Sequence, residues 1–220
     1  MFAPADLHPR VRRLASDAIN RAWAWIATVG CIGPDDAAGR RFGAMGWASC
    51  ICFPPGSVFG EGGIEIGSQT LIGPFVSLAA GMPGQPPRRR DEPPVVVIGD
   101  RCSIGRGSSI VGLRGIEIGD DVAVAPYVYI TDHNHAYEDL TVPIAGQPPV
   151  DGPVRIGSGS WLGTGVVVLP GSDIGCHVAV AAGSVVRGHV PDRCVVAGAP
   201  ARVVRRYEEG QGWDPPLRRP

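Results

Sequence analysis

Two histidines one residue apart mark the stretch of the sequence that is richest in groups for acid–base chemistry. The segment VYITDHNHAYEDL (residues 128–140) carries His133 and His135 on either side of an asparagine, and the whole chain has 5 histidines. Imidazole, with an unperturbed pKa of about 6.5, can accept a proton at neutral pH, and a carboxylate on its other ring nitrogen would fix the tautomer. Asp132, Glu138 and Asp139 are all near enough in sequence to do this. The sequence leaves the choice among the three open.

The composition excludes partners that require a strongly charged surface. Lys and Arg total 20 and Asp and Glu total 21, for a formal net charge of −1. Such a chain has no overall basic footprint for nucleic acid or anionic lipid. No stretch approaches the roughly 18 apolar residues of a membrane span, and the N-terminus lacks the pattern of a signal peptide. We therefore expect a cytoplasmic protein that binds no nucleic acid and inserts into no membrane.

The cysteines give little sign of a metal site. None of the 6 cysteines forms a C-x-x-C pair, and the single C-x-C of Cys50 and Cys52 is a weak metal signal. Reduced thiols that pack as small apolar groups are the expected state. We predict that the chain holds no metal.

The elements that must position the histidines repeat every six residues from residue 60 onward. An aliphatic residue, usually followed by a small one, recurs at this spacing. Four runs keep the phase: Ile66, Ile72 and Leu78; Ile98, Ile104 and Ile110; Ile118, Val124 and Ile130; and Ile156, Leu162, Val168, Ile174, Val180 and Val186. Six residues suit one short strand and a turn, three such units close a triangular coil, and stacked coils bury an aliphatic column. A sandwich or barrel would instead show turn signals every 8–12 residues.

Three interruptions break the six-residue phase. They lie between Leu78 and Ile98, between Ile110 and Ile118, where two extra residues occur, and between Ile130 and Ile156. In stacked coils, insertions become loops on one face, which is often the binding face. The segment with both histidines is therefore expected to stand off the coils.

The two ends of the chain differ from the repeats. Residues 11–29 predict a helix that caps the first coil, because Leu14, Ala18, Ile19, Ala22 and Ile26 recur at helical spacing. The tail has no periodic pattern and is expected to be irregular. The predicted organisation is a helical and irregular cap over 1–59, a coil domain over 60–206 with loop insertions near 81–96 and 131–155, and a tail over 207–220.

Four motifs in residues 156–206 resemble the C-terminal half of the hexapeptide-repeat acyltransferases. They are W-L-G (161–163), V-L-P-G (168–171), A-G-S-V-V (182–186) and V-A-G-A-P-A-R-V-V-R (196–205), in the order and spacing of that family. The family includes galactoside, maltose, xenobiotic and polysaccharide O-acetyltransferases. The resemblance implies an all-β solenoid, namely a left-handed parallel β-helix. It also implies a homotrimer with active sites between subunits and acetyl-CoA as the acyl donor.

The resemblance also implies roles for particular residues. Asn134-His135 fits the place of the family's catalytic histidine, so His135 is predicted as the general base, with Asp132, His133 and Asn134 near the acceptor substrate. The backbone amide of Thr164, after W-L-G, is the expected oxyanion donor. Coenzyme A is expected to contact Trp161, Gly163, Ala181, Ala182, Arg187, Arg202 and Arg205. At Arg187-Gly188 the chain departs from the Thr-Lys found in many members.

The function predicted from these observations is O-acetylation of a sugar or glycan hydroxyl, as in polysaccharide biosynthesis, by direct transfer from acetyl-CoA in a ternary complex. A serine acetyltransferase, an amino-sugar N-acyltransferase and a non-catalytic β-helical binding module remain as alternatives. A γ-type carbonic anhydrase would share the fold, but the histidine spacings here do not resemble its zinc site.

Overall fold

The hexad residues form short strands that pair in three parallel sheets. The computed structural model describes residues 8–82, 84, 86 and 88–216. The first sheet has the order β1 (Ala44–Met45), β4 (Ile64–Ile66), β7 (Val96–Ile98), β10 (Ile116–Ile118), β15 (Val154–Ile156), β18 (Asp173–Ile174) and β21 (His189–Val190). The parallel strands of the second have the order β2 (Cys50–Ile51), β5 (Leu71–Ile72), β8 (Ser103–Ile104), β11 (Ala123–Val124), β16 (Trp161–Leu162), β19 (Ala179–Val180) and β22 (Cys194–Ala197), and two antiparallel strands follow β22 in this sheet. The third has the order β3 (Val58–Phe59), β6 (Ser77–Ala80), β9 (Ser109–Gly112), β12 (Tyr129–Thr131), β17 (Val167–Val168) and β20 (Val185–Val186).

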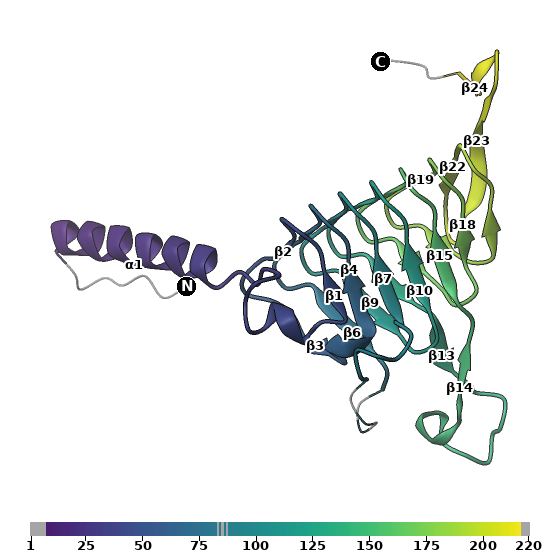
Figure 1. Cartoon of the computed structure of the whole chain (residues 1–220). Helices are drawn as coiled ribbons and strands as arrows, with labels where there is room; N and C mark the ends of the chain where they lie inside the picture. Colours follow the sequence, from purple (N-terminus) through teal and green to yellow (C-terminus); the bar gives the residue numbers. More distant parts are fainter. Residues whose placement is uncertain (1–7, 83, 85, 87, 217–220) are drawn as a thin grey trace.

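The chain visits the three sheets in turn, so each strand pairs with the equivalent strands one turn earlier and one turn later (Figure 1). Ile116, for example, lies between Val96 and Val154 in the register of the first sheet. The prediction of many short parallel strands arranged in sheets is confirmed for residues 44–197, and the strand order is consistent with a β-helix. Parallel pairing already begins at Ala44, which lies before the predicted domain boundary at residue 60.

The aliphatic hexad residues form the core, as the period predicts. The fifteen residues named in the four runs are all buried, and the most exposed of them, Val124, is only 4% exposed. Full burial of such a side chain contributes about 1.5–3 kcal/mol. The repeated inward aliphatic is therefore the main stabilising feature of the coils.

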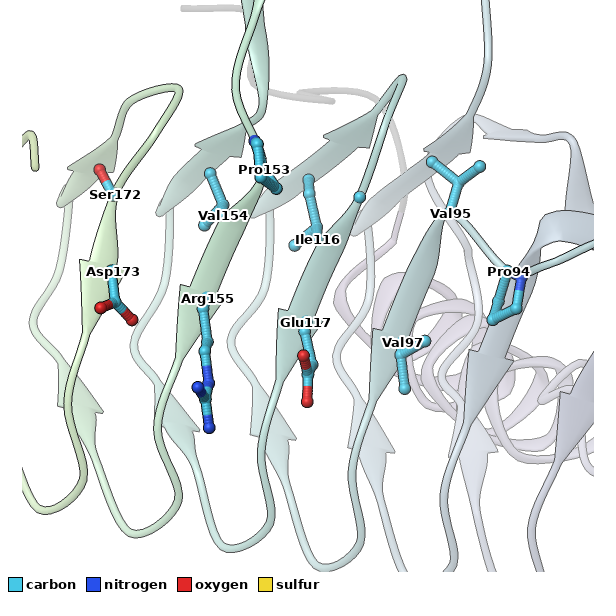
Figure 2. Close-up of a pocket in the computed structure, with 11 residues that line it drawn as sticks. Pro94, Val95, Val97, Ile116, Glu117, Pro153, Val154, Arg155, Ser172 and Asp173 are labelled. Carbon is cyan, nitrogen blue, oxygen red and sulfur yellow. The ribbon is translucent and has the colours of Figure 1, made fainter.

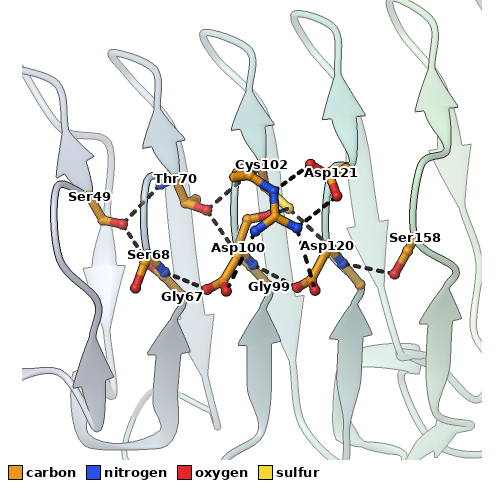
Figure 3. A network of polar contacts seen from close by, with 12 residues as sticks. Ser49, Gly67, Ser68, Thr70, Gly99, Asp100, Cys102, Asp120, Asp121 and Ser158 are labelled. Carbon is orange, nitrogen blue, oxygen red and sulfur yellow. Dashed lines mark hydrogen bonds and ion pairs between the residues drawn. The ribbon is translucent and has the colours of Figure 1, made fainter.

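A polar ladder closes the corner between the first and second sheets (Figure 3). The Thr70 hydroxyl donates to the carbonyl of Gly99 at 2.7 Å and accepts from the amide of Cys102 at 3.0 Å, so it links adjacent turns. One turn on, a Cβ on Gly99 would lie 2.5 Å from a carboxylate oxygen of Asp120. Glycine is required there because the Cβ would also lie 2.7 Å from the carbonyl carbon of Gly119 and 2.8 Å from the amide nitrogen of Asp120, which are backbone atoms of the next turn.

The N-terminal helix forms but does not cover the first coil, contrary to the prediction. Helix α1 (Pro9–Val29) has no buried residue and projects away from the coils (Figure 1). It contacts them through Trp23 and Phe53, whose ring centroids are 6.4 Å apart. Phe42, only 2% exposed, and the partly buried Ile32 pack against the core instead. The aliphatic column is therefore covered at this end without the helix.

The tail is more regular than predicted. β23 (Arg202–Glu208) pairs antiparallel with β22, and β24 (Gly212–Asp214) pairs antiparallel with β23. Gly210 and Gly212 adopt positive φ values of 82° and 86° in this hairpin. These two glycines were the sequence signal that could have predicted a hairpin turn here. The predicted cap and tail also include residues 1–7 and 217–220, which lie outside the described residues.

The first and third interruptions of the repeat form loops that extend outward from the coils. In the first, the Arg90 guanidinium donates to the carbonyls of Arg40 at 3.0 Å and Gly43 at 3.1 Å, which ties the loop to the segment before β1. Positions 83, 85 and 87 of this insertion lie outside the described residues. The later insertion starts with β13 (His133–His135), which pairs antiparallel with β14 (Pro149–Asp151), and the pair projects from the coils (Figure 1). In the described part of the chain, no helix is both long and apolar enough to cross a bilayer.

Candidate functional site

A buried carboxylate holds one of the two histidines. Asp132 is 0% exposed, and one of its oxygens lies 2.9 Å from Nδ1 of His133. The His133 side chain is 15% exposed. A carboxylate at Nδ1 leaves Nε2 as the ring nitrogen that can exchange a proton with a substrate. The pair thus has the arrangement of an oriented general base.

The short second interruption holds this carboxylate. Asp132 accepts hydrogen bonds from the amides of Leu113 at 2.8 Å, Arg114 at 2.7 Å and Gly115 at 2.7 Å. Successive amides that point at one anion form a concave anion site. The two extra residues between Ile110 and Ile118 therefore shape a turn that fixes Asp132, and through it the ring of His133.

The same turn also contacts the antiparallel pair of β13 and β14, the histidine hairpin, where it leaves the coils. Nε of Arg114 lies 2.9 Å from a carboxylate oxygen of Asp151, and the amide of Gly152 donates to the carbonyl of Asp132 at 2.8 Å. The sequence analysis did not identify Leu113, Arg114, Gly115 or Asp151 as site residues. Their only sequence signal was the break in the six-residue phase.

His135 has a different environment from His133. It is exposed and lines a cavity of about 380 Å³. The same cavity is lined by Asn134, Tyr137, Glu138, Leu169 and Arg187, among others. Among the described residues, no carboxylate is hydrogen-bonded to the His135 ring. The structure therefore brings His135, Asn134 and Arg187 together, but gives the orienting carboxylate to His133.

Four of the residues predicted around the acyl group lie at one corner of the coils, where the second sheet turns into the third. The carbonyl of Thr164 accepts a hydrogen bond from the amide of Gly183 at 2.9 Å. Gly163 and Ala182 are also close, since a Cβ on Gly163 would lie 2.6 Å from the amide nitrogen of Ala182. Ala181 precedes Ala182 in the same turn. Thr164 is exposed, and among the described residues no acceptor is hydrogen-bonded to its amide. This amide is free to donate to a ligand.

Trp161 and Arg205 line a second cavity, of about 430 Å³, on the second sheet. His177 and Trp213 line it as well, and neither was predicted. The Arg205 guanidinium lies 5.4 Å from the ring centroid of Trp213, and its Nε donates to the carbonyl of Pro215 at 2.6 Å. Among the described residues, one Arg205 nitrogen (Nη2) is buried without a hydrogen-bond partner. Arg202 is exposed on the same strand, β23.

Within one chain these two groups of residues lie on different faces. The Trp161 group belongs to the second sheet and its corner with the third. The histidine hairpin leaves after β12 in the third sheet and returns to β15 in the first. Apart from Arg187, which lines the cavity of His135, the predicted donor contacts are therefore not assembled into one cleft with the predicted base by a single chain.

One groove on the coils contains none of the predicted site residues. It has a volume of about 590 Å³ and lies on the outer face of the first sheet. Figure 2 shows Val97, Glu117, Arg155 and Asp173 in a row along this face, in agreement with the strand register. Glu117 and Asp173 line this groove, but neither His133 nor His135 does, so its size does not identify it as the site of the predicted base.

Comparison with known proteins places the chain beside acetyltransferases. It is 42% identical over 110 residues to a protein of Mycobacterium tuberculosis named as an acetyltransferase, covering 50% of this chain and 37% of that protein. It is 37% identical over 128 residues to an Escherichia coli protein named as a lipopolysaccharide biosynthesis O-acetyltransferase, WbbJ (54% and 65%). It is 33% identical over 130 residues to the galactoside O-acetyltransferase of Escherichia coli (54% and 61%). The chain thus spans about one third to two thirds of the length of these relatives.

The comparison of structures agrees on the fold. A crystal structure of AntD, an N-acyltransferase from Bacillus cereus, in complex with dTDP-4-amino-4,6-dideoxyglucose and coenzyme A, matches with a TM-score of 0.67 and 20% identity. The match covers 81% of this chain and 91% of that one. No protein-family profile matches the chain. The resemblance to hexapeptide acyltransferases noted in the sequence is confirmed by these relatives.

Proposed function

We propose that the chain, similar over half its length to named acetyltransferases, transfers the acetyl group of acetyl-CoA to a hydroxyl of a sugar or glycan. The named O-acetyltransferases among its relatives support both the donor and the acceptor class. Its coils would form a left-handed parallel β-helix. The observation that carries the proposal is the Asp132–His133 pair, because a sugar hydroxyl is a poor nucleophile until a base removes its proton.

His133, rather than His135, is the general base in this proposal. The prediction from the sequence favoured His135, but the requirement for a carboxylate on the other ring nitrogen is met at His133, where Asp132 lies 2.9 Å from Nδ1. His135 lines the neighbouring cavity with Asn134 and Arg187, which supports a role in binding the acceptor. Arg187 was predicted to contact coenzyme A, and its place in this cavity favours the acceptor instead.

The transfer proceeds in one complex, without an acyl-enzyme. Nε2 of His133 removes the hydroxyl proton as the acceptor oxygen bonds to the thioester carbon. The oxyanion that forms accepts a hydrogen bond from the backbone amide of Thr164. The intermediate then collapses, the carbon–sulfur bond breaks, and the imidazolium returns its proton to the leaving thiolate. The products are an acetyl ester and coenzyme A.

The donor lies along the second sheet in this proposal. Trp161 lines the channel for the pantetheine, with the turns at Gly163, Ala181 and Ala182 close enough for backbone contacts. Arg205 is fixed against Trp213 with one nitrogen unpartnered among the described residues, which supports a role toward a phosphate. The exposed Arg202 on the same strand could add a second charge.

A homotrimer would complete the site. The base and the donor contacts lie on different faces of one chain, so a rotation that closes three copies could bring the hairpin of one subunit to the second sheet of the next. Large apolar side chains on the insertion are exposed and available for such contacts: Tyr137 at 66%, Leu140 at 95%, Ile144 at 55% and Val150 at 54%.

The experiment is release of free thiol from acetyl-CoA with a panel of hydroxyl and amino sugars, using wild type, His133→Ala and His135→Ala. We expect release with a hydroxyl sugar, a loss of about 10²–10⁴-fold in kcat for His133→Ala, and mainly a raised acceptor KM for His135→Ala. The reverse pattern would restore His135 as the base. Turnover only with amino sugars or with serine would select the corresponding alternative acceptor. Absence of thiol release, together with no thermal stabilisation by acetyl-CoA, would leave the non-catalytic binding module.

A further inference from the structure

Three cysteine side chains gather where the N-terminal segment meets the first coil. The sulfur atoms of Cys31, Cys50 and Cys52 all lie within 4.8 Å of one another, and the three residues are half-buried. No predicted site residue is among them. The sequence predicted no metal because it has no C-x-x-C pair and its single C-x-C is a weak metal signal, whereas the fold brings a third cysteine to that pair from outside the repeats.

Strand geometry explains the cluster. Ile51 points into the core and is 1% exposed, so its neighbours Cys50 and Cys52 both face outward. Ile32 pairs antiparallel with Ile51 through two backbone hydrogen bonds of 2.9 Å. This pairing puts Cys31 opposite Cys52 on the same outer face. The three thiols are thus brought together by backbone pairing and not by chance rotamers.

The thiols are close together in a partly dehydrated place. Three thiolates this close would repel one another unless a cation compensated them. Binding of such a cation would release the thiol protons, so it would strengthen as the pH rises.

We propose that Cys31, Cys50 and Cys52 bind one soft d¹⁰ metal ion, Zn²⁺ or Cu⁺, through three thiolates. Zinc–sulfur bonds of about 2.3 Å in tetrahedral geometry require sulfur–sulfur separations of about 3.8 Å, which small side-chain rotations would reach from the present arrangement. No histidine or carboxylate completes the group among the described residues. Zn²⁺ would therefore take a water or another small ligand in its fourth position, whereas Cu⁺ would be satisfied by three thiolates.

The position of the site suggests what the metal does. Cys31 directly follows Gly30, which ends α1, and Cys50 and Cys52 belong to the first coil and the turn after it. The ring contact between Trp23 and Phe53 is one side-chain link between the helix and that coil. A metal bound by all three cysteines would fasten the base of the helix to the first coil.

The test is titration of the reduced, metal-free full-length chain with Co²⁺, read by the thiolate-to-cobalt charge-transfer absorption, followed by displacement with Zn²⁺. A parallel titration with Cu⁺ against a chromogenic chelator distinguishes the two ions. We expect one ion per chain for wild type and for Cys176→Ser, a control in which an equally half-buried cysteine outside the cluster is changed. Cys50→Ser and Cys31→Ser should each weaken binding by at least about tenfold. Two different variants are used in case one fails to fold.

Three results would overturn the proposal. They are the absence of charge-transfer absorption and of Cu⁺ uptake in wild type, unchanged binding in a correctly folded Cys50→Ser or Cys31→Ser, and a disulfide between two of the three cysteines in the protein isolated without reductant. Acetyl transfer is not the readout, so this proposal and the proposed function can fail independently.

Discussion

At the residue scale, hydrogen-bond partners distinguish two histidines that look alike in sequence. His133 and His135 are both in β13, and alternate residues of a strand point to the same side, so strand geometry alone does not distinguish them. His133 lies beside the last buried residue of the coil, Asp132, whereas His135 is one step further out in the exposed hairpin. Three backbone amides hold Asp132, so the ring that it contacts is the better oriented one.

This orientation predicts the effect of Asp132→Asn. The amide side chain keeps the shape but presents an NH₂ group to a site built from N–H donors, so it no longer fixes the His133 tautomer. We expect kcat for thiol release to fall by about 10²–10⁴-fold while thermal stabilisation by acetyl-CoA persists. Asp139→Asn is the matched control, since Asp139 lies in the same insertion and is bonded to Thr141. Equal losses in both variants would contradict the assignment.

Burial predicts a second contrast, between two leucines of the second sheet. Leu162 is 0% exposed and Leu71 is 50% exposed. We expect Leu162→Ala to lower the free energy of unfolding by about 2–5 kcal/mol through lost burial and a residual cavity. Leu71→Ala should cost less than about 1 kcal/mol. Denaturant unfolding measures both, and similar losses would mean that the inward aliphatic column is not the main source of stability.

At the element scale, the interruptions of the repeat build the site while the repeats only support it. The two extra residues after Ile110 make the turn that holds Asp132, and the insertion after Ile130 supplies β13 and β14. If the six-residue repeat had continued unbroken, each of these two places would hold another short strand of the coils instead. The breaks in the pattern thus locate the chemistry.

Helix α1 contributes little to the stability of the coils. Because none of its residues is buried, removal of residues 1–29 should shift the melting temperature of the remaining chain by less than about 3 °C, the change expected for about 1 kcal/mol. Phe42→Ala is the contrasting variant, since Phe42 is 2% exposed, and its loss should cost about 3–5 kcal/mol. A large drop in melting temperature on truncation would show that the helix packs against the coils more extensively than the ring contact between Trp23 and Phe53 indicates.

At the scale of the whole molecule, the separation of the base from the donor contacts predicts complementation between subunits. We expect His133→Ala and Trp161→Ala each to be nearly inactive alone. Mixed by co-refolding, they should regain up to about a quarter of wild-type activity, because about one interface in four then joins two intact halves. Each variant co-refolded with itself is the control. No recovery in the mixture would indicate that both halves act within one chain or that the trimer does not form.

The sequence by itself determined the repeat, the parallel all-β architecture and the place where the repeat is broken. A six-residue period is a local pattern, and each inward aliphatic needs only its own strand and turn to be recognised. Motifs with fixed spacing, such as the run from Trp161 to Arg205, likewise carry the resemblance to acetyltransferases without any knowledge of contacts.

The tertiary structure decided which residues meet. Asp132 and the turn at residues 113–115 are 17 to 19 positions apart in the chain, and Cys31 and Cys52 come together only through the pairing of Ile32 with Ile51. It also decided that α1 stands away from the first coil, that β23 pairs with β22 and that tail residues pair between β23 and β24. These outcomes depend on how adjacent turns stack and on which surface is already covered, and neither is encoded in a period read along one strand.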